Sequence, residues 1–215
     1  MTMARVAVWV LIMMMAVVVG GTSAARAQVG DNRELVNPNL ASADELSELP
    51  GLTGSLVDGL IERRPFLTMT EVDAYLSGTL GRSELEELYQ ALFLPINLNT
   101  APRAEILLVP GIGDRMAHEF EEYRPYLALG QFRREIGKYV DDAEVEQFER
   151  HVFVPIDLNT ASDEAILSIP GLGQRLLHEF KEYRPYRALA QFRREIGKYV
   201  DADEVARLER YVVVK

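Results

Sequence analysis

The sequence predicts an all-α protein built as an array of three 60-residue modules. The chain has 215 residues, and an ungapped repeat covers 36–95, 96–155 and 156–215. The second and third copies share 38 of 60 aligned positions, including the unbroken run QFRREIGKYVD. A repeat of this length is a supersecondary unit whose neighbours bury surface on one another. No long alternation of apolar and polar residues, the pattern of a strand, interrupts it.

The apolar spacing within the second copy predicts four short helices. Thr100 is expected to cap the first helix, with Pro102 in its first turn. The second helix follows a glycine turn and ends before Pro125, because proline disfavours helix in the residue before it. A third helix carries apolar positions as far as Val140, and Asp141 or its neighbour can cap the fourth. About four helices per copy follow from this pattern.

The first 27 residues are typical of a secretory signal peptide. One positive charge near the start is followed by an apolar stretch over 6–20 and by the small-residue exit Ala25-Arg26-Ala27. The apolar stretch is shorter than the ~20 residues that span a bilayer, which favours cleavage over an uncleaved membrane anchor. We therefore expect an exported protein, periplasmic or extracellular, in which 28–35 is a linker.

Charge and cysteine content limit the possible functions. The chain contains no cysteine, which excludes thiol chemistry and cysteine metal sites. Without the leader the formal charge is −12, of which the three copies carry −7, −4 and zero and the segment 28–35 carries −1. The first copy should therefore repel a polyanion, while the third would tolerate one.

Two segments carry a family resemblance. LLVPGIGDRMAHEFEEYR at 107–124 and LSIPGLGQRLLHEFKEYR at 167–184 resemble helix-hairpin-helix motifs. Together with INLNTA and IDLNTA before them, and YRPYLALGQF and YRPYRALAQF at their ends, they resemble the repeat of the exported competence family ComEA. The similarity covers 36–215 and is strongest in the second and third copies.

The resemblance implies sequence-nonspecific binding of double-stranded DNA, in a role such as DNA capture or uptake. Glycine turns leave backbone amides uncovered, and these amides with the start of the next helix can hold a phosphate. A basic residue two positions later could add a charge-assisted bond. The implied phosphate-binding residues are Gly111, Ile112, Gly113, Arg115, Gly171, Leu172, Gly173 and Arg175.

Departures from the family pattern keep a second class open. In the first copy Thr53 and Ser55 replace the second glycine and the arginine, and in the second copy Asp114 adjoins Arg115. The second glycine hairpin that the family places after the third helix is replaced here by acidic residues. The lumenal photosystem subunit PsbU has a similar repeat and a structural role. The alternative is therefore an acidic protein-interaction or scaffold array that binds an envelope or exported protein and no DNA.

Several further sequence patterns are more simply explained by structural roles. Arg134 and Lys138 could extend a phosphate track, but we expect them to pair with Glu135. The tyrosines beside each Arg-Pro pair could stack on bases, but we expect them to cover the second helix. His178-Glu179 begins a zinc-protease-like pattern that lacks its second histidine. We expect no metal, no cofactor, no small-molecule substrate and no catalytic residues, so the chain is not expected to be an enzyme.

Overall fold

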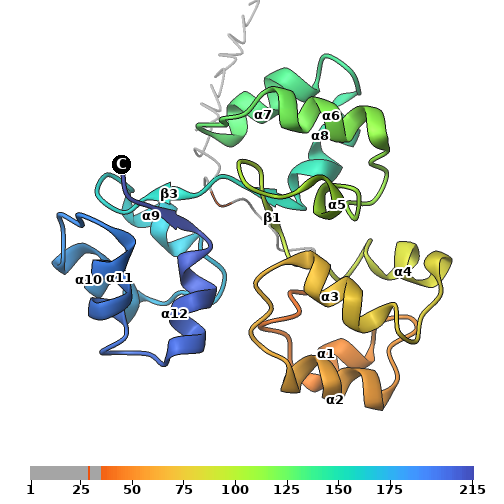
Figure 1. Ribbon diagram of the computed structural model, residues 1–215, viewed down its shortest axis with the longest axis horizontal. Coiled ribbons are helices and arrows are strands. Elements are labelled where there is room, and N and C mark those ends of the chain that lie inside the picture. Colours follow the sequence, from red (N-terminus) through yellow and green to blue (C-terminus); the bar gives the residue numbers. More distant parts are fainter. Residues whose placement is uncertain (1–28, 30–34) are drawn as a thin grey trace, which may run out of the picture.

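The described part of the protein is mostly helical. The computed structural model describes residues 29 and 35–215, so the predicted signal peptide at 1–27 lies outside the described residues. Figure 1 shows three groups of helices arranged around a centre where short strands lie. Among the residues described, no helix has the length and apolar character needed to cross a membrane.

Each sequence copy contributes four helices to the described structure. In the first copy these are α1 (Ala43–Ser47), α2 (Gly54–Glu62), α3 (Met69–Leu76) and α4 (Arg82–Leu88). In the second they are α5 (Arg103–Ile106), α6 (Asp114–Glu122), α7 (Leu129–Ile136) and α8 (Asp142–Glu149). In the third they are α9 (Asp163–Leu167), α10 (Gln174–Glu182), α11 (Leu189–Ile196) and α12 (Ala202–Glu209).

Short parallel ladders join the beginning of each copy to its end. Strand β1 (Ile96–Asn97) pairs with β2 (Val152–Phe153), and β3 (Ile156–Asp157) pairs with β4 (Val212–Val213). In the first copy the same place holds a single bridge between Val36 and Leu92. The sequence did not predict these ladders, because two residues are too short for an alternating pattern.

An asparagine and an arginine tie the two loops of each copy together. The Asn39 side chain donates to the Phe66 carbonyl at 2.8 Å and accepts from the Phe66 N–H at 2.7 Å. Arg64 donates to two carbonyls of the opening loop, those of Pro38 and Ala41, each at 2.6 Å. Asn99 with Arg124 and Asn159 with Arg184 repeat both sets of bonds. In every copy the peptide bond between this arginine and the following proline is cis.

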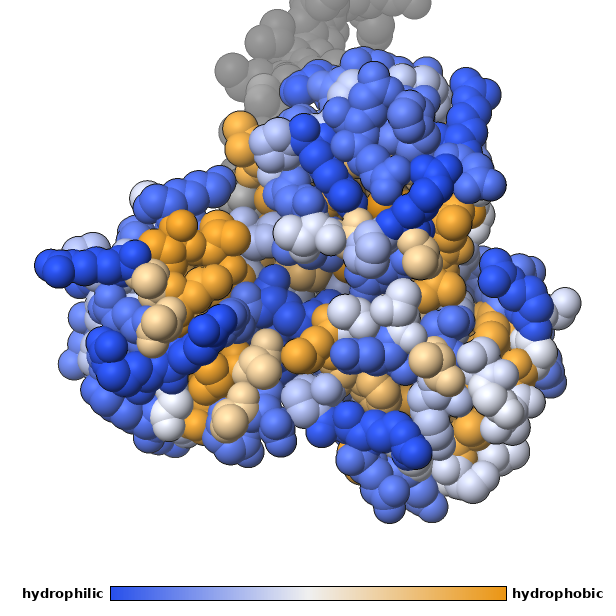
Figure 2. Space-filling model, viewed as in Figure 1, coloured by the Kyte–Doolittle hydropathy of each residue, from blue (hydrophilic) through white to orange (hydrophobic). Residues whose placement is uncertain are grey.

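The apolar core forms two clusters. One joins the first and second copies, and the other holds the third. Val29, in the segment expected to be a linker, is fully buried in the cluster of the third copy. Hydrophilic residues cover much of the outer rim of the face shown in Figure 2.

Polar contacts also cross between copies. Glu105 on α5 accepts a 2.6 Å hydrogen bond from the Met69 N–H, at the start of α3. This carboxylate is 4% exposed, and its burial raises the pKa of Glu105. Arg210 donates to the Pro95 carbonyl at 2.8 Å, which ties the third copy to the segment between the first two. These two hydrogen bonds link residues of different copies.

Equivalent positions use different chemistry for the same contact. Arg103 and Glu121 pair at 2.9 Å between α5 and α6, and in the third copy Asp163 and Lys181 pair at 2.6 Å with the charges reversed. The equivalent residues of the first copy are both apolar, Ala43 and Ile61. The two charges can therefore be exchanged between the helices, and the first copy has no ion pair at these positions.

Two details of the predicted helices were wrong. Thr100 does not cap α5, because Pro102 occupies the cap position and the chain turns at 97–101 first. The third helix of that copy ends at Ile136, and Tyr139 beyond it is 38% exposed. Asp141 does cap α8, accepting a hydrogen bond from the Glu144 N–H at 2.9 Å.

The asparagine tie generates a stability prediction. In an Asn39→Ala variant the Phe66 N–H and carbonyl lose their partners while Phe66 stays 3% exposed. Leaving a buried polar group unpaired costs about 1–3 kcal/mol, so the free energy of unfolding should fall by about 2–4 kcal/mol in urea titrations. Exposed Gln90→Ala is the control, and a loss no larger than that of the control would contradict the role of the tie.

A second prediction concerns His151, which is 1% exposed between the first and second copies. Its Nδ1–H donates to the Gln147 carbonyl at 2.8 Å, and its ring meets the Phe93 ring edge-on at 4.8 Å. Burial lowers the pKa of His151, and the neighbouring Arg150 charge acts in the same direction.

Because the folded pKa lies below the unfolded value of about 6.5, the stabilisation from neutral His151 is fully present above that pH and is lost as the pH falls. The third copy has Tyr211 at the equivalent position, 4.7 Å from Phe153, so His151→Tyr is the matched variant. Denaturation at pH 8 and pH 5.5 should show a loss for the original chain that exceeds the variant's by about 1 kcal/mol. An equal loss of unfolding free energy in the original chain and in the His151→Tyr variant would contradict this prediction.

Candidate anion-binding hairpins

The first glycine of each hairpin is required by the backbone. Gly51, Gly111 and Gly171 have φ angles of +78°, +85° and +76°, in the left-handed region that favours glycine. The residue after each of them donates back across the bend, as when the Ile112 N–H bonds the Val109 carbonyl at 3.1 Å. This turn is the same in all three copies and is explained by local geometry alone.

The second glycine is not required by the backbone. Gly113 has φ −103° and ψ 179°, and Gly173 has φ −101° and ψ 174°, which is ordinary extended conformation. Thr53 takes the equivalent place in the first copy with φ −84° and ψ 163°. A Cβ added at Gly113 or Gly173 would meet no atom within 4 Å. A two-glycine bend can hold positive φ, but here the first glycine alone does so, and neither conformation nor internal packing explains why 113 and 173 lack a side chain.

The two hairpins leave the first turn of a helix uncapped. Gly113 and Gly173 are the N-cap residues of α6 and α10, both nine residues long, and no side chain accepts from the first-turn amides. These N–H groups have no partner within the helix and carry its positive dipole end. Gly111, Gly113, Gly171 and Gly173 are all exposed, so the amides border solvent. The geometry can receive an anionic oxygen.

The other predicted site residues divide into two kinds. Ile112 and Leu172 are 8% and 7% exposed, so their side chains anchor the hairpins and only their main chain remains available. Arg115 and Arg175 are exposed at the start of the helices. Neither arginine has a hydrogen bond or ion pair with another described residue, and the Arg175 guanidinium lies 6.0 Å from the Tyr199 ring centre. Both cations are thus free to meet a ligand.

The charge beside the two hairpins differs. Asp114 lies in the first turn of α6, but Arg103 donates to its carboxylate at 3.0 Å and to its carbonyl at 2.7 Å. This pairing, which the sequence did not reveal, offsets the charge next to Arg115. In the third copy Gln174 takes the place of Asp114, and the first turn of α10 has no acidic residue. The third-copy hairpin is therefore the more favourable for an anion.

Both hairpins also adjoin the first copy. A Cβ at Gly171 would lie 3.0 Å from Leu40 Cδ2, a contact between the third and first copies. Pro110 and Ile112 line a hollow of about 90 Å³ together with Leu85, Glu86 and Tyr89 in and after α4. One side of each bend is thus partly covered, whereas the side that carries Gly113 or Gly173 stays open.

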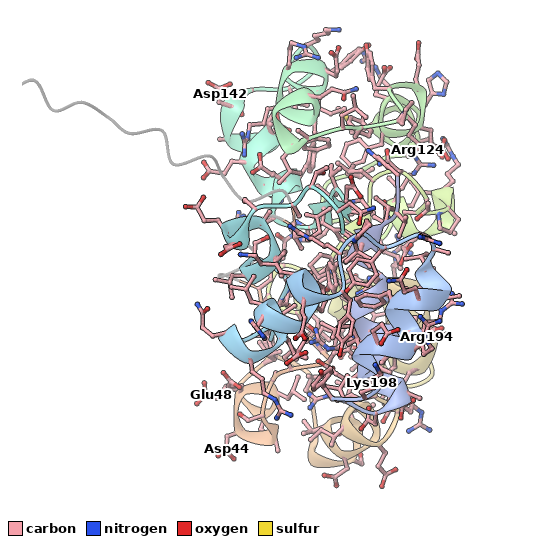
Figure 3. The ribbon with its side chains drawn as sticks, turned by 90° about the vertical axis from the view of Figure 1, so that its left-hand side faces the viewer. Asp44, Glu48, Arg124, Asp142, Arg194 and Lys198 are labelled. Carbon is pink, nitrogen blue, oxygen red and sulfur yellow. The ribbon has the colours of Figure 1, made fainter. Side chains whose placement is uncertain are left out.

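Arg134 and Lys138, together called the basic ridge, are neutralised by an acidic neighbour, as we expected. Glu135 pairs with Arg134 at 2.8 Å and with Lys138, and these cations lower the pKa of Glu135. The third copy repeats the arrangement around Glu195. Figure 3 shows Arg194 and Lys198 near each other at the end of α11. Arg133 and Arg193 bind Glu149 and Glu209 on the following helix. These cations are occupied within the fold.

The tyrosines next to the Arg-Pro pairs are structural. Tyr126 and Tyr186 are 1% and 2% exposed and pack against Phe132 and Phe192. The Tyr123 and Tyr139 hydroxyls lie 2.8 Å apart, as do those of Tyr183 and Tyr199. Because Tyr126 and Tyr186 are buried, their rings cannot stack on bases.

Comparison with known proteins adds no assignment, since no protein-family model, curated protein or solved structure matches the chain.

Proposed function

We propose that this chain is an exported, nonenzymatic DNA-binding protein that resembles ComEA, made of three tandem helix-hairpin-helix modules. The hairpins of the second and third modules hold phosphates of double-stranded DNA without reading its sequence. Such binding would serve the capture or uptake of DNA outside the inner membrane. Export depends on the predicted leader at 1–27.

The observation that carries this proposal is the missing side chain at 113 and 173. Glycine is not needed there for φ, and a Cβ would have open space. The first copy has threonine in the same conformation. The remaining reason for a glycine at this position is that a ligand approaches the backbone amides closely. Any side chain there would obstruct that approach.

The three copies should contribute unequally to DNA binding. The first combines Thr53 and Ser55 with a charge of −7, so its hairpin has a structural role alone. The second has its acidic first turn offset by Arg103, and the third has a neutral first turn and no net charge. Two hairpins that offer ~2–4 phosphate contacts give weak, salt-sensitive binding.

The second candidate is an acidic scaffold array comparable to PsbU. It is favoured by the neutralised basic ridge, by the charge of −12 without the leader and by the contact of both hairpins with the first copy. In that case the glycines have no ligand, and the partner is an exported or envelope protein. DNA binding distinguishes the two candidates.

The proposal predicts that Gly113→Thr with Gly173→Thr weakens DNA binding and leaves the fold intact. Threonine already occupies the equivalent place in the first copy, so the backbone accepts it, but its side chain covers the amides. Anisotropy of a labelled duplex at low salt should show weaker binding by at least about tenfold, and removal of Arg115 and Arg175 should weaken it further.

Arg134→Ala with Arg194→Ala is the matched control, because it also removes two positive charges but takes them from paired arginines. It should weaken binding less than Arg115→Ala with Arg175→Ala does. No binding of the original chain at low salt, or equal binding by the glycine variant, would remove the DNA proposal and leave the scaffold.

A further inference from the structure

A buried arginine lies behind the bend of the third hairpin. Arg207 on α12 is 3% exposed, and its Nη1 donates to the Pro170 carbonyl at 2.6 Å. Its Nε and Nη2 donate to the two carboxylate oxygens of Glu204 at 2.6 and 2.7 Å. A Cβ added at Gly171 would lie 3.2 Å from Arg207 Nη2. The bend therefore rests on a cation that α12 holds in place.

The first copy contacts the same bend. The Cβ position of Gly171 lies 3.0 Å from Leu40 Cδ2, and in Figure 1 α12 is on the side of the third copy that faces the first. A charge-assisted hydrogen bond and an apolar contact thus confine the bend, whereas Gly173 two residues later has open space around it. The third hairpin is fixed on one side and open on the other.

The residue behind the bend changes from copy to copy in a regular order. Glu87 in the first copy and Gln147 in the second are the equivalents of Arg207. Glu87 is an acceptor when ionised, and Gln147 carries no charge, with its Nε2 3.9 Å from the Cβ position of Gly111. The order acidic, neutral, basic is also the order of the net charges of the copies, which are −7, −4 and zero.

A fixed bend with a cation behind it favours an anion at the amides that follow. Donors that are already ordered lose less conformational freedom when a ligand binds. The guanidinium also adds positive charge near the uncapped start of α10, where the helix dipole has the same sign. Glu204 offsets part of this charge, but its side chain is 30% exposed to water and that of Arg207 is 4% exposed.

We propose that Arg207 is a positioning residue that makes the third hairpin the primary phosphate-binding hairpin of the chain. This inference rests on the proposed function, because the phosphate is that of the DNA backbone. Arg207 does not touch the phosphate. It acts through the Pro170 carbonyl on the bend, and the bend positions the amides of 173–175. The exposed Arg175 is the cation that meets the ligand.

Titration of the chain with inorganic phosphate, followed by amide NMR, tests this role. Inorganic phosphate is small enough to bind each hairpin independently, so shifts at 113–115 and 173–175 report two separate affinities. Arg207→Gln installs the residue of the second copy and should weaken binding at 173–175 by about threefold or more, because it removes a charge-assisted hydrogen bond. Arg187→Gln removes an exposed cation of the same copy and is the control, with a smaller expected effect.

Gln147→Arg is the reciprocal variant, and a purely structural role would not produce its expected result. Glu144 stands where Glu204 stands in the third copy, so the new arginine has the same carboxylate available. Binding at 113–115 should strengthen by about threefold, while binding at 173–175 stays as it was. Urea unfolding of each variant separates a loss of stability from a loss of binding.

Three results would overturn the role of Arg207. One is equal phosphate affinity of the two hairpins in the original chain. The others are unchanged affinity at 173–175 in Arg207→Gln and unchanged affinity at 113–115 in Gln147→Arg. Each can occur while the original chain still binds a labelled duplex, so the proposed function would survive them. Absence of duplex binding at low salt is the separate result that removes the proposed function and this inference with it.

Discussion

The hydrogen bonds of one asparagine and one arginine per copy hold this structure together. Asn39, Asn99 and Asn159 satisfy both backbone groups of the residue that follows the cis Arg-Pro pair. The arginine of that pair reaches back to two carbonyls in the opening loop. This loop leads into the first helix, and the Arg-Pro segment follows the second. The tie therefore fixes the ends of the two helices whose junction is the glycine bend.

These hydrogen bonds are the same in all three copies, and the side chains differ at other positions. The pair Arg103 and Glu121 becomes Asp163 and Lys181, and the first copy has apolar residues at these positions. The residue before each second helix has one conformation in all three copies but is threonine once and glycine twice. A change that leaves the backbone as it was points to a difference in what approaches from outside. Duplicated modules in which one copy keeps the shape and loses the contact residues fit a binding array.

The sequence predicted the helical class and the position of the bends, because proline, glycine and apolar spacing act locally. It missed features that depend on distant residues. Arg103 next to Asp114, Leu40 against Gly171 and Glu105 at the start of α3 all join segments that the sequence separates. It also did not say which glycine of each bend has positive φ, since a Gly-x-Gly pattern does not show which residue turns.

The most direct test of the account is to follow individual backbone amides by NMR while a short DNA duplex is added at low salt. The amides of 113–115 and 173–175 should shift first and most, with the third copy responding at the lower DNA concentration, while those of 53–55 remain in place. Shifts that spare both glycine hairpins, or that appear equally at 53–55, would contradict the claim that bare amides at these two bends hold phosphate.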